Sequence, residues 1–149
     1  MSVELGVATR EDLPQLVALL GVLFSQEAEF VPDDTKQTRA LEKILADDSV
    51  GRIHVARAGR KVVAMASLIY GISTAEGGLA ASFEDLIVLP GYRSKGIGSA
   101  LLQYVIAEAR KQGVLRLMLL TDKQNERAQA LYRKAGFSDS TMKAMRLKL

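Results

Sequence analysis

Cysteine is absent from the 149 residues, and histidine occurs once, as His54. Without cysteine the chain can form no disulfide, no thiolate nucleophile and no cysteine-ligated metal, and one histidine cannot build a histidine cluster. His54 lies inside an apolar run that we predict to be a strand, where a lone histidine is more often structural than catalytic. We therefore expect no metal, and we expect catalysis to use carboxylate, hydroxyl, phenol or backbone groups.

Long apolar runs are also missing, and none reaches the length that spans a membrane. The N-terminus lacks the basic region and apolar core of a signal peptide, so the expected location is the cytoplasm. The formal net charge is +3, but the positive residues are dispersed among acids, and only four tyrosines and four phenylalanines occur. A stacking platform for nucleic acid is therefore not expected.

The composition that is present is that of a soluble globular protein, with 48% hydrophobic and 25% charged residues. The length fits one domain, residues 1–149, and is too short for two ordinary ones. No repeat, linker or low-complexity segment interrupts it.

Apolar spacing predicts the order strand, helix, helix, three strands, helix, strand, helix and a last strand or two. This order indicates a mixed sheet of α+β type. The last of the three consecutive strands carries Glu84. It ends before Pro90, which has no N–H for a sheet ladder. The other predicted strands cover about residues 3–8, 51–58, 61–72, 115–121 and 137–149, and the helices begin after Thr9, near Thr35, after the loop at 93–99 and at Asn125.

Residues 84–113 have the pattern of a strand that delivers an anion to the start of a helix. The first N–H groups of a helix have no internal partners, and the helix dipole makes that end positive, so a phosphate group would bind there. Gly113 ends the predicted helix as a left-handed cap. The loop before the helix has two glycines that leave room for an anion and two cations that attract it: Gly96, Gly98, Arg93 and Lys95.

Two well-known phosphate loops fit this stretch poorly. Residues 91–96 have the spacing of a nucleoside-triphosphate loop, but Ile97 and Gly98 stand where that chemistry needs a lysine and a serine or threonine. The pair Gly96 and Gly98 also begins a dinucleotide fingerprint, whose third glycine would be Leu101. Asp122 lies roughly where a ribose-binding acid would, so the dinucleotide interpretation is weakened and stays open.

A better match is Arg93, two residues, Gly96, one residue and Gly98 after a strand, which resembles the acetyl-coenzyme A loop of the Gcn5-related N-acetyltransferase (GNAT) superfamily. Downstream, Asn125 and residues 130–137 resemble the second signature of that superfamily. The resemblance implies an acetyltransferase-type fold, with a mixed, mostly antiparallel sheet of six to seven strands flanked by four helices. It also implies that two central parallel strands splay apart to admit the pantetheine arm of acetyl-coenzyme A (acetyl-CoA).

The resemblance further implies which residues bind acetyl-CoA. Backbone N–H groups of the strand would meet the pantetheine and thioester, the glycine loop would hold the pyrophosphate, and Asn125 would bond the cofactor arm. For Asn125 a helix N-cap role is an equal alternative. The implied cofactor-binding residues are Ile87, Val88, Arg93, Ser94, Lys95, Gly96, Ile97, Gly98, Ser99 and Asn125.

Two catalytic residues follow from the same resemblance. Tyr132 matches the tyrosine that protonates the departing coenzyme A sulfur, and a phenol stays protonated at neutral pH. Glu84, nine residues before Arg93, stands where polyamine-type members carry a glutamate that accepts the amine proton through water. Asp85 is its alternate, since neighbouring strand residues face opposite sides and we expect only one of the two to face the cleft.

We thus expect an acetyl-CoA-dependent N-acetyltransferase that acts on a primary amine of a small molecule. The acids of residues 26–34 could attract a cationic amine, although a solvated acidic loop is the simpler interpretation. The alternative function is a coenzyme A or nucleotide-binding module without turnover. The sequence also leaves a homodimer open.

Overall fold

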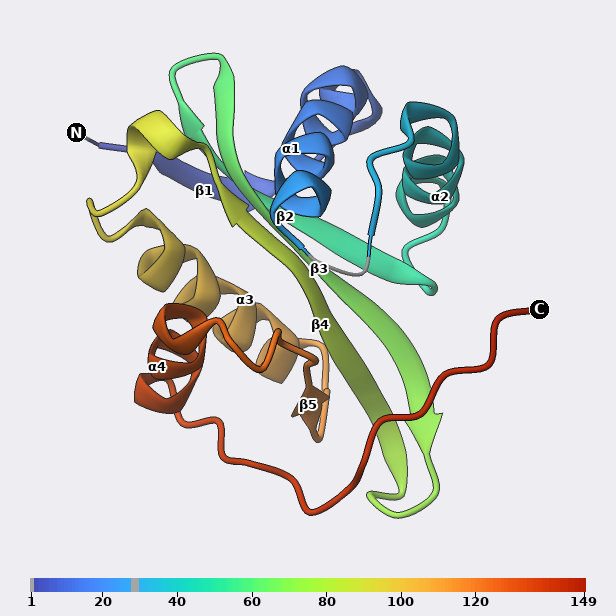
Figure 1. Cartoon of the computed structure of the whole chain (residues 1–149). Coiled ribbons are helices and arrows are strands. Elements are labelled where there is room, and N and C mark those ends of the chain that lie inside the picture. Colours follow the sequence, from blue (N-terminus) through green and yellow to red (C-terminus); the bar gives the residue numbers. More distant parts are fainter. Residues whose placement is uncertain (1, 28–29) are drawn as a thin grey trace.

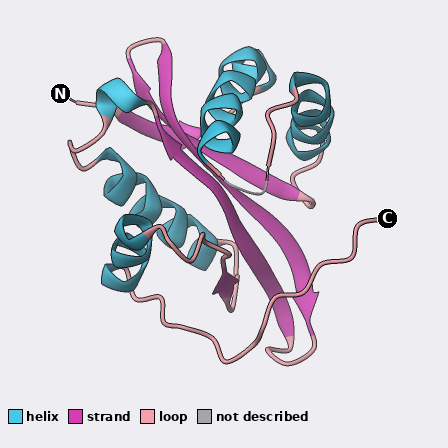
Figure 2. Cartoon of the chain, viewed as in Figure 1, coloured by secondary structure: helices cyan, strands magenta, loops and turns pink. Residues whose placement is uncertain are grey.

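A five-stranded sheet forms the centre of the computed structural model, which describes residues 2–27 and 30–149 (Figure 1). Helices lie on both sides of the sheet, as Figure 2 shows. The strands are β1 (Glu4–Val7), β2 (Gly51–Ala58), β3 (Lys61–Ser73), β4 (Gly78–Val88) and β5 (Leu117–Met118). The helices are α1 (Leu13–Gln26), α2 (Asp34–Ala46), α3 (Ile97–Lys111) and α4 (Glu126–Lys134), with short 3-10 turns at Arg10–Asp12 and Pro90–Tyr92.

The strands follow one another in the order β1-β2-β3-β4-β5. Strands β1 to β4 are antiparallel, and β5 is parallel to β4 because the crossover through α3 returns the chain in the same direction. The predicted α+β class and the four helices are confirmed, with five strands in the described structure instead of six to seven.

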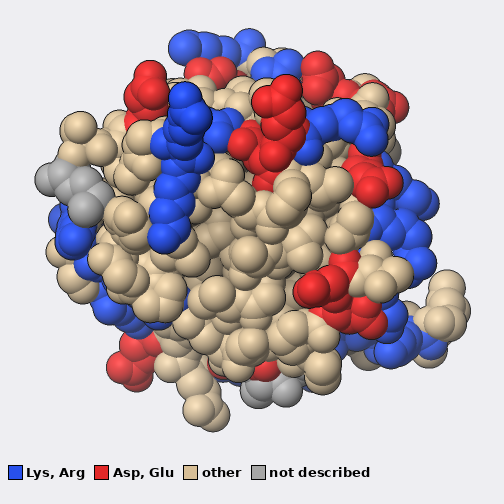
Figure 3. All heavy atoms as spheres, turned by 90° about the horizontal axis from the view of Figure 1, so that it is seen from above, with Lys and Arg blue, Asp and Glu red and all other residues tan. Residues whose placement is uncertain are grey.

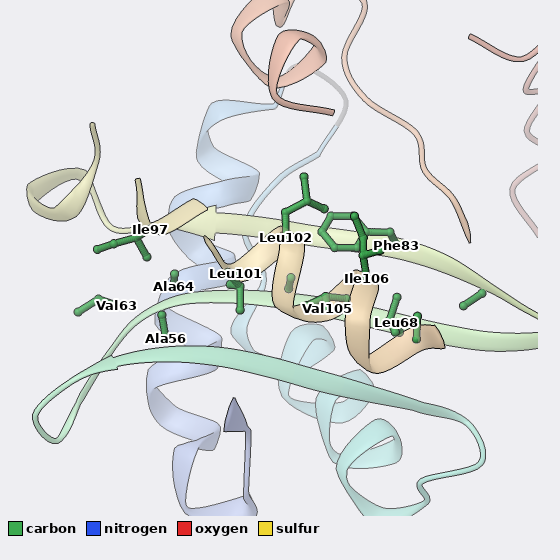
Figure 4. Packing of buried hydrophobic residues seen from close by; sticks show 13 residues of the cluster. Ala56, Val63, Ala64, Leu68, Phe83, Ile97, Leu101, Leu102, Val105 and Ile106 are labelled. Carbon is green, nitrogen blue, oxygen red and sulfur yellow. The ribbon is translucent and has the colours of Figure 1, made fainter. Parts of the chain in front are cut away.

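Two hydrophobic clusters hold the helices to the two faces of the sheet. Apolar residues of α3, which recur at helical spacing, pack on β2, β3 and β4 (Figure 4). On the opposite face, Leu16, Leu19 and Leu20 of α1 and Leu41 of α2 pack against alternate residues of the same strands. Because both faces are covered there, most of β2 and residues 62–68 of β3 are buried, whereas β3 is exposed at residues 71–72.

The N-terminal connection is fixed by Asp12, the buried last residue of the first 3-10 turn, which is bonded to Arg57 of β2. Its carboxylate accepts hydrogen bonds from both terminal nitrogens of Arg57, each at 2.6 Å, and from the Thr9 N–H at 2.8 Å. The pKa of Asp12 is lowered chiefly by the hydrogen bonds from Arg57. Thr9 is the N-cap of the 3-10 turn. The helix expected directly after Thr9 is α1, which begins at Leu13.

The C-terminal third departs from the sequence prediction. The strand expected at residues 115–121 is reduced to Leu117–Met118, and the strand expected after Phe137 is wrong, because residues 138–149 have no regular structure. A two-residue β5 provides almost no ladder for a further strand, so the alternating apolar side chains of the C-terminal segment gain no burial. Met142, Met145 and Leu147 are 78%, 90% and 83% exposed. This segment runs past the β3–β4 hairpin toward the α2 side (Figure 1), where Arg146 lies 5.6 Å from the centroid of the Phe30 ring.

On the face seen from above in Figure 3, basic and acidic side chains are interspersed around a broad uncharged area. Within the described part of the chain, no helix is both long and apolar enough to cross a bilayer.

Candidate functional site

The loop between β4 and α3 has the geometry that the sequence predicts for an anion site. Gly96 is the N-cap of α3 with φ +81, a left-handed conformation that favours glycine, and Ala100 N–H donates the first helical bond to its carbonyl at 3.0 Å. The N–H groups of Ile97, Gly98 and Ser99 precede that bond, so they have no acceptor within the helix. A Cβ added at Gly98 would lie 3.5 Å from Val88, which is ordinary packing distance.

The side chain of Arg93 does not extend from this loop into solvent. Its Nε donates to the Val88 carbonyl at 2.9 Å. Its two terminal nitrogens face the side chain of Gln26, the last residue of α1; with the amide oxygen oriented toward them, the distances are 2.7 and 3.2 Å. The guanidinium therefore joins the end of β4 to the end of α1.

Other cations stand at the loop. The Lys95 ammonium lies 5.7 Å from the centroid of the Tyr92 ring, and the Lys61 ammonium lies 5.6 Å from the same ring. Arg127 of α4 donates from Nη2 to the Ser94 hydroxyl at 3.0 Å. Sequence reasoning missed Lys61 and Arg127, because each comes from an element distant in the chain. The one available signal for Arg127 was its position two residues after Asn125.

Strand β4 carries a bulge directly before this loop. Glu84 pairs with Ser67 and Ile87 pairs with Met65, so two residues of β4 oppose one residue of β3. Asp85 is the extra residue and has φ +58. The expected alternation of Glu84 and Asp85 across a regular strand is therefore wrong: Glu84 shares its face with Ile87, three residues later, and Asp85 stands outside the alternation.

The edge of β4 beyond Ser82 is open toward β5. The β4–β5 ladder consists of Ala81 with Leu117 and Ser82 with Met118, and no further pairing occurs among the described residues. The backbone of residues 83–88 therefore has no strand partner on that side. These unpaired residues lead to the α3 loop, and the superfamily resemblance implied a gap between parallel strands along this edge.

Tyr132 of α4 lies across from this open stretch. Its ring makes edge contacts with Phe83 of β4, at a centroid distance of 6.0 Å, and with Phe137, at 5.8 Å. Burial, with a smaller contribution from the negative charge of Glu27, raises the pKa of the Tyr132 phenol to about 12. The phenol therefore holds its proton at neutral pH and can donate it.

Asp85 is the second perturbed group at this place. Burial, followed by the charges of Glu84 and Glu27, raises its pKa to about 7. The charge of Glu27, the residue after α1, thus raises the pKa of both Asp85 and Tyr132. Glu84 itself is exposed. Of the acids expected in the α1–α2 connection, residue 29 lies outside the described residues.

Comparison with known proteins agrees with this arrangement. The model of the acetyltransferase (GNAT) family matches residues 17–137. An N-acetyltransferase of Mycobacterium tuberculosis, itself uncharacterised, is 32% identical over 120 residues, which are 80% of this chain and 72% of the relative. The chain belongs to the GNAT family of acetyltransferases.

Two further proteins extend the comparison. The glucosamine 6-phosphate N-acetyltransferase of Trypanosoma brucei brucei is 28% identical over 144 residues, which cover 92% of this chain and 90% of the relative. A predicted acetyltransferase of Clostridium acetobutylicum, whose crystal structure was solved with acetyl-CoA, has the same fold with a TM-score of 0.79 and 19% identity, covering 99% and 96% of the two chains. The chain is thus an acetyltransferase enzyme with the acetyl-CoA-binding GNAT fold, and acetyl-CoA is its acyl donor.

Two residues of the GNAT chain have their local roles defined by the structure. The Asn125 side chain accepts a hydrogen bond from the Ala128 N–H at 3.1 Å, so it forms the N-cap of α4. His54 is fully buried in β2 with its ring edge toward Tyr104 of α3, and it lies in the core instead of at the loop. Within residues 2–27 and 30–149, no group of three acids or histidines is arranged to hold a metal.

Proposed function

We propose that this GNAT enzyme acetylates a primary amine of a small molecule by direct attack on the thioester, with Tyr132 as general acid and Glu84 as the base that acts through water. The supporting observation is the contact of the Tyr132 ring with Phe83, the residue before Glu84, at the edge of β4 that has no strand partner; the phenol is protonated at neutral pH. A donor and an acceptor of protons therefore lie on either side of the strand that would hold the thioester.

The proton balance assigns each group one task. The amine nitrogen attacks the thioester carbon, a C–N bond forms, and the C–S bond breaks. The acceptor ammonium first gives one proton through water to the Glu84 carboxylate, and the neutral nitrogen then attacks. As the C–S bond breaks, the Tyr132 phenol gives its proton to the leaving thiolate, and the second proton, which the nitrogen loses on becoming an amide, returns through solvent to the Tyr132 phenolate. Backbone N–H groups near Ile87 and Val88 would polarise the carbonyl, and the loop from Arg93 to Ser99 would hold the pyrophosphate.

Glu84 and Asp85 are the two candidates for the base, and different observations support them. Glu84 is exposed and faces the side of the sheet that carries α1 and α2, because it pairs with Ser67 and shares its face with Ile87. Asp85 has a pKa of about 7, near the value that suits a base at neutral pH. We keep Glu84 as the proposed base and Asp85 as its alternate.

A small-molecule acceptor is supported by the Trypanosoma relative, whose name gives glucosamine 6-phosphate as its acceptor. The carboxylates of the bulge favour an amine that is cationic in solution. We also propose a cytoplasmic location and leave a homodimer as a proposal that sedimentation would test.

The decisive test is turnover with acetyl-CoA across a panel of polyamines, amino acids, amino sugars and peptides. We expect release of free coenzyme A with a small amine, and acetylation of peptides alone would contradict the small-molecule proposal.

The base is then tested by kcat/KM against pH for Glu84→Gln and Asp85→Asn with the best amine. Glu84→Gln should lose most activity near neutral pH and recover partly at high pH, where more amine is neutral. A severe loss confined to Asp85→Asn would give the role to Asp85.

A further inference from the structure

The anion loop has two arginines near it, and the structure gives them different partners. Arg93 belongs to the loop sequence, but its guanidinium is engaged by the protein at three nitrogens: Nε on the Val88 carbonyl, and the two terminal nitrogens on Gln26. These contacts use three of its five N–H donors, one on each nitrogen, so the guanidinium cannot turn to face a phosphate without breaking the link between β4 and α1. The position of Arg93 in the sequence pattern therefore does not make it the arginine that meets the anion.

Arg127 comes from α4 and reaches the same loop. Its contact to Ser94 joins residues 33 positions apart, and it uses one of the five N–H donors of the guanidinium. The partner is a neutral hydroxyl, and among the residues that the structure describes Arg127 makes no ion pair. Planar guanidinium groups bind phosphate oxygens in pairs, which a lysine ammonium cannot do.

Ser94 also ties Arg127 to the anion position. It adopts φ +64, two residues before the left-handed Gly96 that caps α3. The guanidinium of Arg127 is therefore held beside the loop whose free helix N–H groups would meet the pyrophosphate. Lys95, over the Tyr92 ring, is a second cation of this loop.

We propose that Arg127 contacts the diphosphate of acetyl-CoA, and that Arg93 is a positioning residue that fastens the loop to β4 and α1. The inference rests on the acetyl-CoA site described above and assigns a division of labour within it. It follows that removing the charge of Arg127 weakens cofactor binding, whereas at Arg93 the forked geometry matters more than the charge.

The first experiment measures the Kd of coenzyme A and of dephospho-coenzyme A by calorimetry for Arg127→Gln. The control is Lys134→Gln, which removes one positive charge two turns farther along the same helix. A charge-assisted hydrogen bond is worth about 1.5–3 kcal/mol, so we expect binding of both ligands to weaken about 10- to 100-fold in Arg127→Gln. Lys134→Gln should change each Kd less than about twofold.

Three outcomes would overturn the assignment of Arg127. Equal losses in Arg127→Gln and Lys134→Gln would show a general charge effect. A loss for coenzyme A but not for dephospho-coenzyme A would place Arg127 at the 3′-phosphate. An unchanged Kd for both ligands would mean that Arg127 does not contact the cofactor. Failure of the wild-type chain to bind either ligand would instead contradict the cofactor site itself.

The second experiment tests the positioning role with Arg93→Lys, Gln26→Ala and the double variant. Arg93→Lys keeps the charge but loses the fork, so we expect the KM for acetyl-CoA to rise about 3- to 10-fold with kcat retained. Gln26→Ala should raise the same KM although it lies on α1, and the double variant should be no worse than Arg93→Lys, because both changes break one contact. Wild-type KM in Arg93→Lys and in Gln26→Ala, with a loss only in Arg93→Gln, would show that the charge of Arg93 acts on the phosphate directly.

Discussion

Protonation of one side chain, His54, should remove stability from the fold between pH 6.5 and 4. The imidazole is fully buried in β2 beneath α3, and neither ring nitrogen has a hydrogen-bond partner among the described residues. Burial lowers the pKa of His54 to about 4; the charge of Glu108 opposes this and that of Arg52 adds to it. The folded protein therefore keeps His54 neutral at a pH where the unfolded chain protonates it.

The size of the effect follows from the two pKa values. His54 titrates at 6.5 in the unfolded chain and at about 4 in the folded protein. At about 1.4 kcal/mol per pKa unit, this difference removes about 3 kcal/mol of stability. Above pH 6.5 the imidazole is neutral in both states and contributes no pH dependence. As the pH falls from 6.5 to 4, the unfolded state binds a proton on His54 that the folded state does not. Below about pH 4 the loss of stability due to His54 is complete.

Asp85 acts in the opposite direction over much of the same range. Its folded pKa of about 7 lies above the ordinary 3.8, so the folded state binds a proton that the unfolded state has released. Falling pH therefore adds stability through Asp85 while it removes stability through His54. The pH dependence of the wild-type protein alone would hide both effects.

The assay is therefore a difference between wild type and His54→Phe, which keeps a ring beside Tyr104 and cannot titrate. Urea unfolding at intervals from pH 7.5 to 4 should show the free energy of unfolding of wild type falling by about 3 kcal/mol relative to the variant. Because the chain has one histidine, its ring proton resonances need no assignment by mutation. A stability difference that is independent of pH, or a folded-state midpoint near 6.5, would refute the argument.

Three further changes test other parts of the structure. Tyr132→Phe should lower kcat about 10- to 1000-fold with the KM for acetyl-CoA nearly unchanged, and an unchanged kcat with chemistry rate-limiting would leave Tyr132 a packing residue. Asp12→Ala should cost about 2 kcal/mol in urea unfolding at pH 7, because it leaves the partly buried Arg57 unpaired, and the cost should shrink as the pH falls below 3.8; Asp139→Ala, an exposed ion-pair control, should cost less than about 0.5 kcal/mol. Gly96→Ala should destabilise the fold by about 1 kcal/mol, since a Cβ there meets no atom within 4 Å and only its φ of +81 is unfavourable; wild-type stability in thermal unfolding would contradict this.

The features that the sequence predicted well depend on nearby residues. The helix after the loop begins at Ile97 and ends at Lys111 because a left-handed glycine precedes it and Gly113 follows it within three residues. The hairpin at Gly59 is equally local, and the two strands that it joins lie where the apolar pattern placed them. Turn chemistry and periodicity are properties of short stretches, so they can be read without the rest of the chain.

The features that could not be predicted from the sequence depend on contacts between distant segments. The bulge at Asp85 exists only relative to the pairing register with β3, which no pattern within β4 reveals. The alternation after Phe137 is suited to a strand, but a strand needs an edge to pair with, and β5 is two residues long. The contact of Arg93 with Gln26 depends on where α1 ends. The hydrogen bond from Arg127 to Ser94 depends on where α4 packs.

The bulge in β4 has a consequence for insertions and deletions. Phe83 and Leu86 pack on the α3 side and Ile87 packs on the α1 side, so the core faces of the strand would be in register if Asp85 were absent. Deletion of Asp85 alone should therefore leave a folded hairpin with both cores intact, whereas deletion of Ser82 should exchange the faces of the residues before it and unfold the domain. A regular antiparallel hairpin and the bulged hairpin of this chain thus differ by one inserted residue, which a single three-nucleotide insertion could supply.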